Sequence, residues 1–145
     1  MTWKADVYRL CLVKEKTVEY GKVNMPDNVI EIMKQLGCEQ WSEEYVYAFC
    51  MDASNQIIGI HEISHGTTNA SICSPKDIFK RALSNNATAI IVTHNHPSGD
   101  PTPSKEDCKI TRKVVEAGKL LGIDVLDHII LGDRYYFSFS EQGLL

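Results

Sequence analysis

The chain has 145 residues, of which 43% are hydrophobic and 23% are charged. A chain of this size buries enough apolar surface for one core, so residues 1–145 are expected to form a single domain. No segment approaches the roughly 18 consecutive apolar residues of a membrane span, and the first ten residues lack the apolar core of a signal peptide. The sequence therefore argues against membrane insertion and secretion.

Charge and cysteine content narrow the class of protein further. The net charge is −4 with histidine neutral, which is opposite to the basic footprint of a dedicated nucleic-acid binder. The chain has five cysteines, an odd number, and no Cys-x-x-Cys pair. This pattern disfavours a disulfide framework or a four-cysteine zinc site and predicts a cytoplasmic location. Cys11 and Cys50 lie in strand-like runs and are expected in the core.

Short runs rich in β-branched and aromatic residues predict strands over 6–13, 45–51, 56–62, 87–94, 125–132 and 135–140. Residues 17–23 are expected to pair with the first run as a hairpin. Capping residues and apolar spacing predict helices over 27–36, 75–85 and 104–121. Hairpins mixed with strand–helix units predict an α/β (α+β) domain, in which helices pack on a mixed sheet.

The most informative stretch is IIVTHNHPSGDPTPSKED, residues 90–107. His94 and His96 follow a predicted strand and are two residues apart, so their side chains share one face and can converge on one point. The loop that follows contains three of the five prolines of the chain. Such a loop is stiff and is expected to hold a fixed geometry.

The third predicted helix begins with Ser104 as its N-cap and has Asp107 at its third position. Its apolar stripe, continued back three residues from Ile110, reaches Asp107, so this carboxylate faces the sheet that carries the histidines. Two imidazoles and one carboxylate are a common zinc ligand set that leaves the fourth position to water. His94, His96 and Asp107 are therefore candidate ligands of a catalytic Zn²⁺. The simpler alternative is a capped helix beside two hydrogen-bonded histidines.

A hydrolytic zinc site also needs a base for its water, and Glu62 at the end of the strand 56–62 is the candidate. The alternative for Glu62 is an ordinary surface carboxylate. Strand alternation places His61 on the opposite face, and neither it nor His65 is included among the ligands. Asp127 and His128 interrupt an apolar run, which favours structural hydrogen bonds, or a contact to a ligand, over direct metal ligation.

These residues also carry a family resemblance. His94 and His96 are followed by seven residues, then Ser104, two residues and Asp107. With an upstream glutamate, this order resembles the JAMM motif of the JAB/MPN metalloprotease superfamily, and the string HNHPSGDPTPSKED resembles its bacterial RadC branch. The similarity covers about residues 26–145 and is strongest over 56–140.

The resemblance implies a JAB/MPN domain, related to the cytidine deaminase fold, with Zn²⁺ held by His94, His96 and Asp107. It also implies that Glu62 is the general acid and base and that Ser104 stabilises the oxyanion. The implied activity is that of a zinc-dependent metallohydrolase, a metallopeptidase or isopeptidase that uses a metal-activated water on a peptide or isopeptide substrate.

Two other functions stay open. RadC-like proteins carry an N-terminal helix-hairpin-helix domain, which this chain is too short to contain. A protein of DNA repair or of mobile elements, acting on or near DNA, is one alternative, although the acidic balance does not support it. A catalytically silent JAB domain that serves as an interaction module is the other. The sequence specifies neither the substrate nor the oligomeric state.

Overall fold

The computed structural model describes residues 1–22, 26–66 and 73–145. Its centre is a five-stranded sheet with the strand order β2-β1-β3-β4-β5. The strands are β1 (Glu44–Met51), β2 (Ile57–Gly66), β3 (Ala89–Asn95), β4 (Asp124–Leu131) and β5 (Tyr136–Ser138). Strands β3 and β4 are parallel, whereas the other neighbours are antiparallel. This mixed sheet confirms the predicted fold class.

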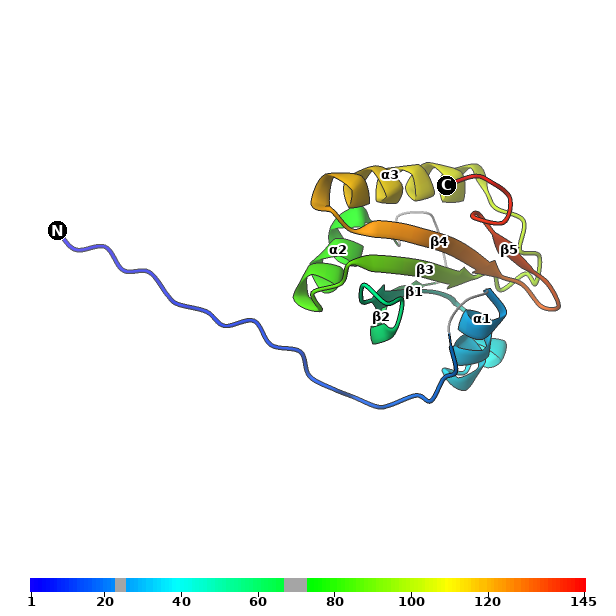
Figure 1. Cartoon of the computed structure of the whole chain (residues 1–145), viewed down its shortest axis with the longest axis horizontal. Coiled ribbons are helices and arrows are strands. Elements are labelled where there is room, and N and C mark those ends of the chain that lie inside the picture. Colours follow the sequence, from blue (N-terminus) through cyan, green and yellow to red (C-terminus); the bar gives the residue numbers. More distant parts are fainter. Residues whose placement is uncertain (23–25, 67–72) are drawn as a thin grey trace.

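Helices cover both faces of the sheet (Figure 1). They are α1 (Pro26–Gln35), the 3₁₀ turn η1 (Cys38–Gln40), α2 (Pro75–Ser84) and α3 (Lys105–Leu121). Helices α2 and α3 pack on one face through a core that contains Ile78, Phe79 and Val114. Helix α1 packs on the other face through Val29, Ile32 and Met33. Among the described residues, no helix is both long and apolar enough to cross a bilayer.

Helix α3 is delimited by its caps. Its N-cap Ser104 accepts a hydrogen bond from the backbone of Asp107, and its C-cap Gly122 has a φ of 72°, a left-handed conformation that favours glycine. Gly118 lets the end of this helix approach the sheet, because a Cβ there would collide with the carbonyl oxygen of Ile123. The caps and this close contact fix the helix that carries Asp107.

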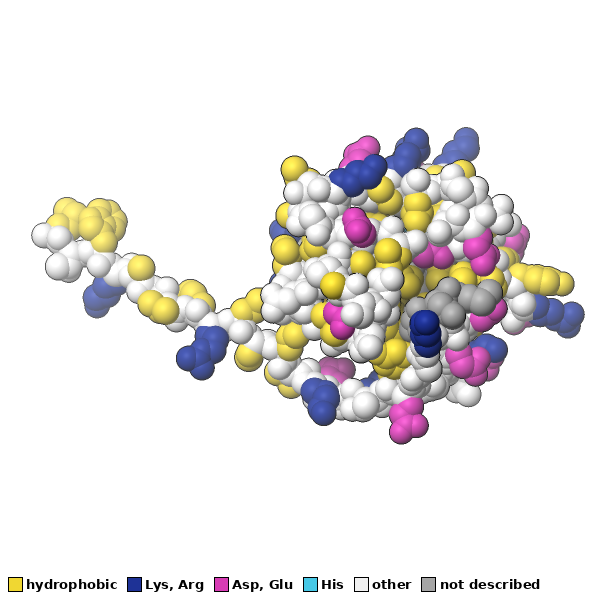
Figure 2. Space-filling model, viewed as in Figure 1, with side chains coloured by type: hydrophobic (Ala, Val, Ile, Leu, Met, Phe, Trp, Pro, Cys, Tyr) yellow, Lys and Arg dark blue, Asp and Glu magenta, His cyan; other side chains and the backbone are white. Residues whose placement is uncertain are grey.

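The prediction of a strand over 6–13 is wrong. Residues 1–22 have no regular secondary structure, and the first part of this segment extends away from the domain, with hydrophobic side chains in solvent (Figures 1 and 2). Val7 is 97% exposed, and Cys11 is exposed rather than buried. The hairpin predicted for 17–23 is absent over 17–22, and residue 23 lies outside the described residues. An alternating pattern gives only a propensity, and a strand is stable only with a neighbour.

Candidate metal site

Strand β3 ends at the site. His94 is its penultimate residue, and His96 follows its last residue, Asn95. His94 lies opposite Val46 of β1, so its side chain points to the face covered by α2 and α3. The Nε2 atoms of the two imidazoles are 3.0 Å apart. The predicted convergence of His94 and His96 is therefore present in the structure.

The loop after β3 is held by hydrogen bonds at several points. The backbone N–H of His96 donates to Leu131 (2.8 Å), and the N–H of Asp133 donates to the carbonyl of Gly99 (2.8 Å). Nδ1 of His96 lies 2.8 Å from the backbone carbonyl oxygen of Asp100. Because a carbonyl only accepts, this Nδ1 carries a proton, and the lone pair of the neutral ring is on Nε2, at the cluster.

Asp107 combines the two roles considered from the sequence. Its Oδ2 accepts a hydrogen bond from the backbone N–H of Ser104 (2.7 Å), and its own N–H donates to Ser104 Oγ (3.1 Å), which completes a capping box. Its Oδ1 is 3.3 Å from His94 Nε2, and its Oδ2 is 3.3 Å from His96 Nε2. The helix cap therefore fixes the carboxylate against both imidazoles.

Glu44, the first residue of β1, is a fourth member that the sequence analysis missed. Its Oε1 lies 3.6 Å from His94 Nε2. Asn95 fixes the backbone around it, because its Oδ1 accepts from the N–H of Tyr45 (2.7 Å) and its Nδ2 donates to the carbonyl of Glu43 (2.9 Å). In the sequence, Glu44 looks like one of two charged residues before a strand. The one feature of the sequence that could have indicated a role for Glu44 in the site is its position at the start of a strand.

The structure does not bring Glu62 to this cluster. Val46 pairs with Ser64 but Tyr47 pairs with Glu62, so Ile63 is an extra residue that forms a β-bulge. Glu62 therefore shares the face of Tyr47, which packs on the α1 side, and its Oε1 lies 3.4 Å from His65 Nδ1. The bulge reverses the expected alternation, so His61, rather than Glu62, lies on the face of the sheet that carries the histidine cluster.

The four side chains have the geometry of a metal site. One ligand atom from each of Glu44, His94, His96 and Asp107 lies within 4.8 Å of all the others. Zinc bonds to N and O of about 2.0–2.1 Å imply ligand atoms about 3.3 Å apart in a tetrahedron. The contacts of 3.0, 3.3, 3.3 and 3.6 Å between these side chains match this spacing. The cluster could therefore bind a metal ion.

Comparison with known proteins gives the family of this chain. A family profile of the RadC-like JAB domain matches residues 23–144. The chain belongs to the RadC-like JAB domain family. It is 45% identical over 143 residues to a UPF0758 protein of Methanosarcina barkeri, an alignment that covers 97% of this chain and 62% of the relative. A UPF0758 protein of Symbiobacterium thermophilum is 49% identical over 104 residues, 72% of this chain and 44% of that protein.

This RadC-like JAB domain thus spans about three fifths or less of the length of these curated relatives. A UPF0758 protein of Alkaliphilus metalliredigens gives the same relationship, with 43% identity over 88% of this chain and 55% of the relative. The match extends over α1, the whole sheet and α3. The family assignment therefore applies to the domain that carries the histidine cluster.

The electrostatics of the RadC-like JAB domain favour a cation at the cluster. The hydrogen bond to Asp107 raises the pKa of His96 above its usual value. Burial alone raises the pKa of Asp107, but the hydrogen bonds with His94 and His96 outweigh it and hold that pKa well below the usual range. Both shifts favour the charged forms of the pair, a carboxylate and an imidazolium, and a metal ion would take the place of the proton between them.

Asp127 and His128 have the two non-ligand roles expected for them. Asp127 accepts hydrogen bonds from Ser138 Oγ (2.6 Å) and from the N–H of Ser140 (3.0 Å), so it joins β4 to the end of the chain. Burial raises its pKa despite these bonds. His128 is buried and lies with its Nε2 2.8 Å from Nδ1 of His94. One residue is structural, and the other contacts a candidate metal ligand.

Proposed function

We propose that this domain is a zinc-dependent hydrolase that cleaves peptide or isopeptide bonds. The observation that carries the proposal is the convergence of two imidazoles and two carboxylates from three separate elements on one point. Imidazole and carboxylate are ligands that zinc accepts readily. His94, His96 and Asp107 would hold the ion, since their side chains are only 4%, 17% and 13% exposed.

Glu44 is the carboxylate that we assign to proton transfer. A bound Zn²⁺ would supply Lewis acidity, which polarises a carbonyl and lowers the pKa of water. The Glu44 side chain is 29% exposed, the most of the four, so it can exchange protons with solvent and with a leaving group. Glu62 was the candidate from the sequence. Its place on the opposite face of the sheet favours Glu44 for this role.

Ser104 is the residue that we assign to the substrate oxygen. Its Oγ accepts a hydrogen bond from the N–H of Asp107, so its own proton is available for a further acceptor. The residue is exposed at the start of α3, next to the carboxylate of the cluster. A donor at this place would stabilise the negative charge that develops on a carbonyl oxygen.

The net charge of −4 supports a peptide or isopeptide over a nucleic acid as the substrate. The five cysteines are all free, which supports a reducing, cytoplasmic setting. These features bear on the partner and the compartment, whereas the cluster bears on the chemistry.

The test is hydrolysis of a library of peptides and lysine-linked isopeptides by zinc-loaded, chelator-treated and zinc-restored protein. Hydrolysis that is lost with the chelator and regained with zinc is expected. Asp107→Asn should lose the activity, and Glu106→Gln, which changes a neighbouring exposed carboxylate, should keep it. A protein that binds zinc but cleaves nothing in the library would favour the silent interaction module instead.

A further inference from the structure

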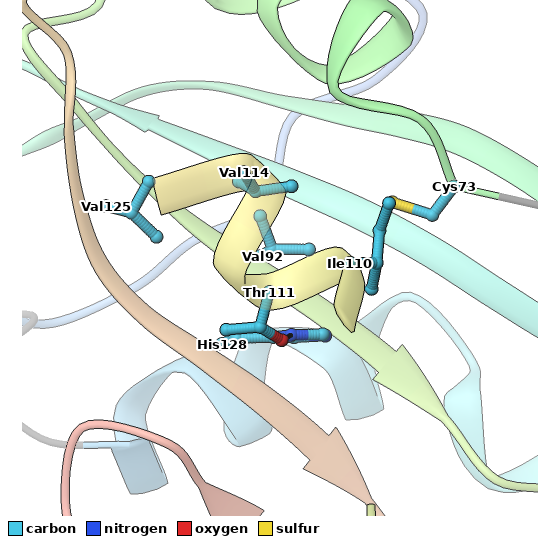
Figure 3. Close-up of a pocket in the computed structure, with 7 residues that line it drawn as sticks. All are labelled: Cys73, Val92, Ile110, Thr111, Val114, Val125 and His128. Carbon is cyan, nitrogen blue, oxygen red and sulfur yellow. Dashed lines mark hydrogen bonds between the residues drawn. The ribbon is translucent and has the colours of Figure 1, made fainter. Parts of the chain in front are cut away.

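A chain of hydrogen bonds runs from the backbone of α3 through β4 to His94. The Thr111 hydroxyl donates to the backbone carbonyl of Asp107 (2.7 Å), one turn earlier in the helix. Thr111 Oγ1 lies 2.6 Å from Nδ1 of His128 (Figure 3). Nε2 of His128 lies 2.8 Å from Nδ1 of His94. Each link is buried or part-buried, so solvent does not compete for these groups.

The direction of every bond follows from its first acceptor. A carbonyl oxygen only accepts, so the single proton of the Thr111 hydroxyl points to Asp107. Thr111 Oγ1 must then accept from His128, which places the His128 proton on Nδ1. The Nε2 atom of the neutral ring is left as an acceptor, and it must accept from Nδ1–H of His94. Nε2 of His94 is then the nitrogen that faces the cluster, 3.0 Å from His96 Nε2 and 3.3 Å from Asp107 Oδ1, and its lone pair would be offered to a bound metal ion.

We infer that Thr111, acting through His128, fixes the tautomer in which His94 presents a lone pair to the metal site. Thr111 and His128 are positioning residues, because neither belongs to the ligand cluster itself. The inference rests on the proposed function for the metal, although the tautomer can be observed without it. It adds a determinant of metal affinity that lies one and two side chains away from the ligands.

The side chains around His128 hold its ring in place. The small cavity beside it is lined, apart from Thr111, by Cys73, Val92, Ile110, Val114 and Val125, as Figure 3 shows. The ring stacks on Phe139 with centroids 5.0 Å apart and planes at 10°. Packing therefore fixes the orientation of the ring, and the hydroxyl of Thr111 fixes its proton.

Loss of the hydroxyl would free the opposite tautomer. With its proton on Nε2, His128 would donate to Nδ1 of His94. The proton of His94 would then sit on Nε2, where it blocks metal ligation. Partners of metal-ligating histidines typically change metal affinity about 10–100-fold when they are removed. The same range is expected here for Thr111.

The test compares Thr111→Val with Thr111→Ser, because valine keeps the shape of threonine and serine keeps its hydroxyl. Zinc affinity is measured by competition with a chromophoric chelator, and thermal unfolding checks that both variants fold. Thr111→Val should bind zinc about 10–100-fold more weakly, whereas Thr111→Ser should stay close to the wild type. Equal affinities of the two folded variants would overturn the inference.

A second readout needs neither zinc nor a variant. Nitrogen-15 NMR of the imidazoles in metal-free wild type, at mildly alkaline pH, reports which ring nitrogen carries the proton. A proton on Nδ1 of both His94 and His128 is expected, with Nε2 of His128 unprotonated. A proton on Nε2 of His128 would refute the inference even if the protein binds zinc. If the expected tautomers are found in a protein that binds no zinc, the proposed function is contradicted, whereas the inferred proton arrangement is supported.

Discussion

The side-chain amide of Asn95 bonds to the backbone on both sides of Glu44. It accepts from the N–H of Tyr45 at 2.7 Å and donates to the carbonyl of Glu43 at 2.9 Å. Asn95 itself lies between the two histidines of the cluster. The end of β3 therefore supplies two imidazoles directly and positions the Glu44 carboxylate of β1 through the residue between them.

Asn95→Ala should lower the free energy of unfolding by about 1–3 kcal/mol, because it leaves two part-buried backbone groups at the start of β1 unpaired. The amide of Tyr45 should also exchange its hydrogen faster. Asn95→Asp keeps the acceptor for the N–H of Tyr45 but cannot donate to the carbonyl of Glu43. The Tyr45 amide should therefore lose less protection from hydrogen exchange than it does in Asn95→Ala. Urea unfolding and hydrogen exchange check this. Unchanged protection of Tyr45 in the alanine variant would show that Asn95 does not hold the strand.

Glu44→Gln and Glu62→Gln should behave differently. If Glu44 carries the proton, its amide variant should retain metal through the other three side chains and lose about 10²–10⁴-fold in hydrolysis. Glu62→Gln changes a carboxylate on the opposite face and should retain both properties. Metal content and hydrolysis rate, measured side by side, separate the two. A loss of activity in Glu62→Gln with Glu44→Gln fully active would restore the assignment from the sequence.

The stability of the metal-free protein should depend on pH through the cluster. The raised pKa of His96 means that the folded chain holds this proton more tightly than the unfolded chain. The stability that His96 contributes is therefore complete below the ordinary imidazole pKa of about 6.5, and it is lost as the pH rises through the raised pKa of the folded state. The lowered pKa of Asp107 gives a contribution that is present above about 3.9 and is lost as the pH falls through its folded value.

Denaturant unfolding at a series of pH values checks how the free energy of unfolding changes with pH on the acid side and on the alkaline side. Asp107→Asn removes the carboxylate that shifts His96, so the decline in stability above neutral pH should become shallower. The decline on the acid side should also shrink, since one strongly shifted carboxyl is gone. An Asp107→Asn variant with the same pH profile as the wild type would contradict the pairing of these two groups.

Removal of residues 2–14 should leave the stability of the domain nearly unchanged, within about 0.5 kcal/mol. These residues make no regular structure, and Trp3 is 89% exposed. Contacts with the domain begin at Val18, which packs on the core, and include Tyr20, whose hydroxyl donates to the carbonyl of Ile57 (3.0 Å) and accepts from its N–H (3.1 Å). Tyr20→Phe should therefore cost more than the truncation. The reverse order in thermal unfolding would mean that the first residues pack on the domain.

The sequence was sufficient for the parts of the fold that depend on local signals. Ser74 before a proline, Ser104 as a cap and Gly122 as a terminator define α2 and α3, and the structure places these helices within one residue of the prediction. The apolar run that forms β3 is buried along its whole length. Burial and capping are encoded residue by residue, so these elements are readable without a structure.

The sequence could not indicate which glutamate joins the histidines. Strand alternation puts Glu62 on the correct face only if β2 is regular, and the bulge at Ile63 reverses that face. Glu44 joins the cluster through a pairing of β1 with β3, and Val46 lies opposite His94 although 48 positions separate them. Register and bulges are properties of strand pairs, so they appear only when the sheet is assembled.

The most direct test of the metal site is elemental analysis of purified protein after exposure to zinc, for wild type, Asp107→Asn and Glu106→Gln. Circular dichroism confirms that each folds, and asparagine can still accept the capping bond from Ser104. About one zinc per chain is expected in the wild type and in Glu106→Gln, with most of it lost in Asp107→Asn. Folded wild type that holds no zinc, or an Asp107→Asn variant that holds as much as the wild type, would contradict a metal centre at His94, His96 and Asp107.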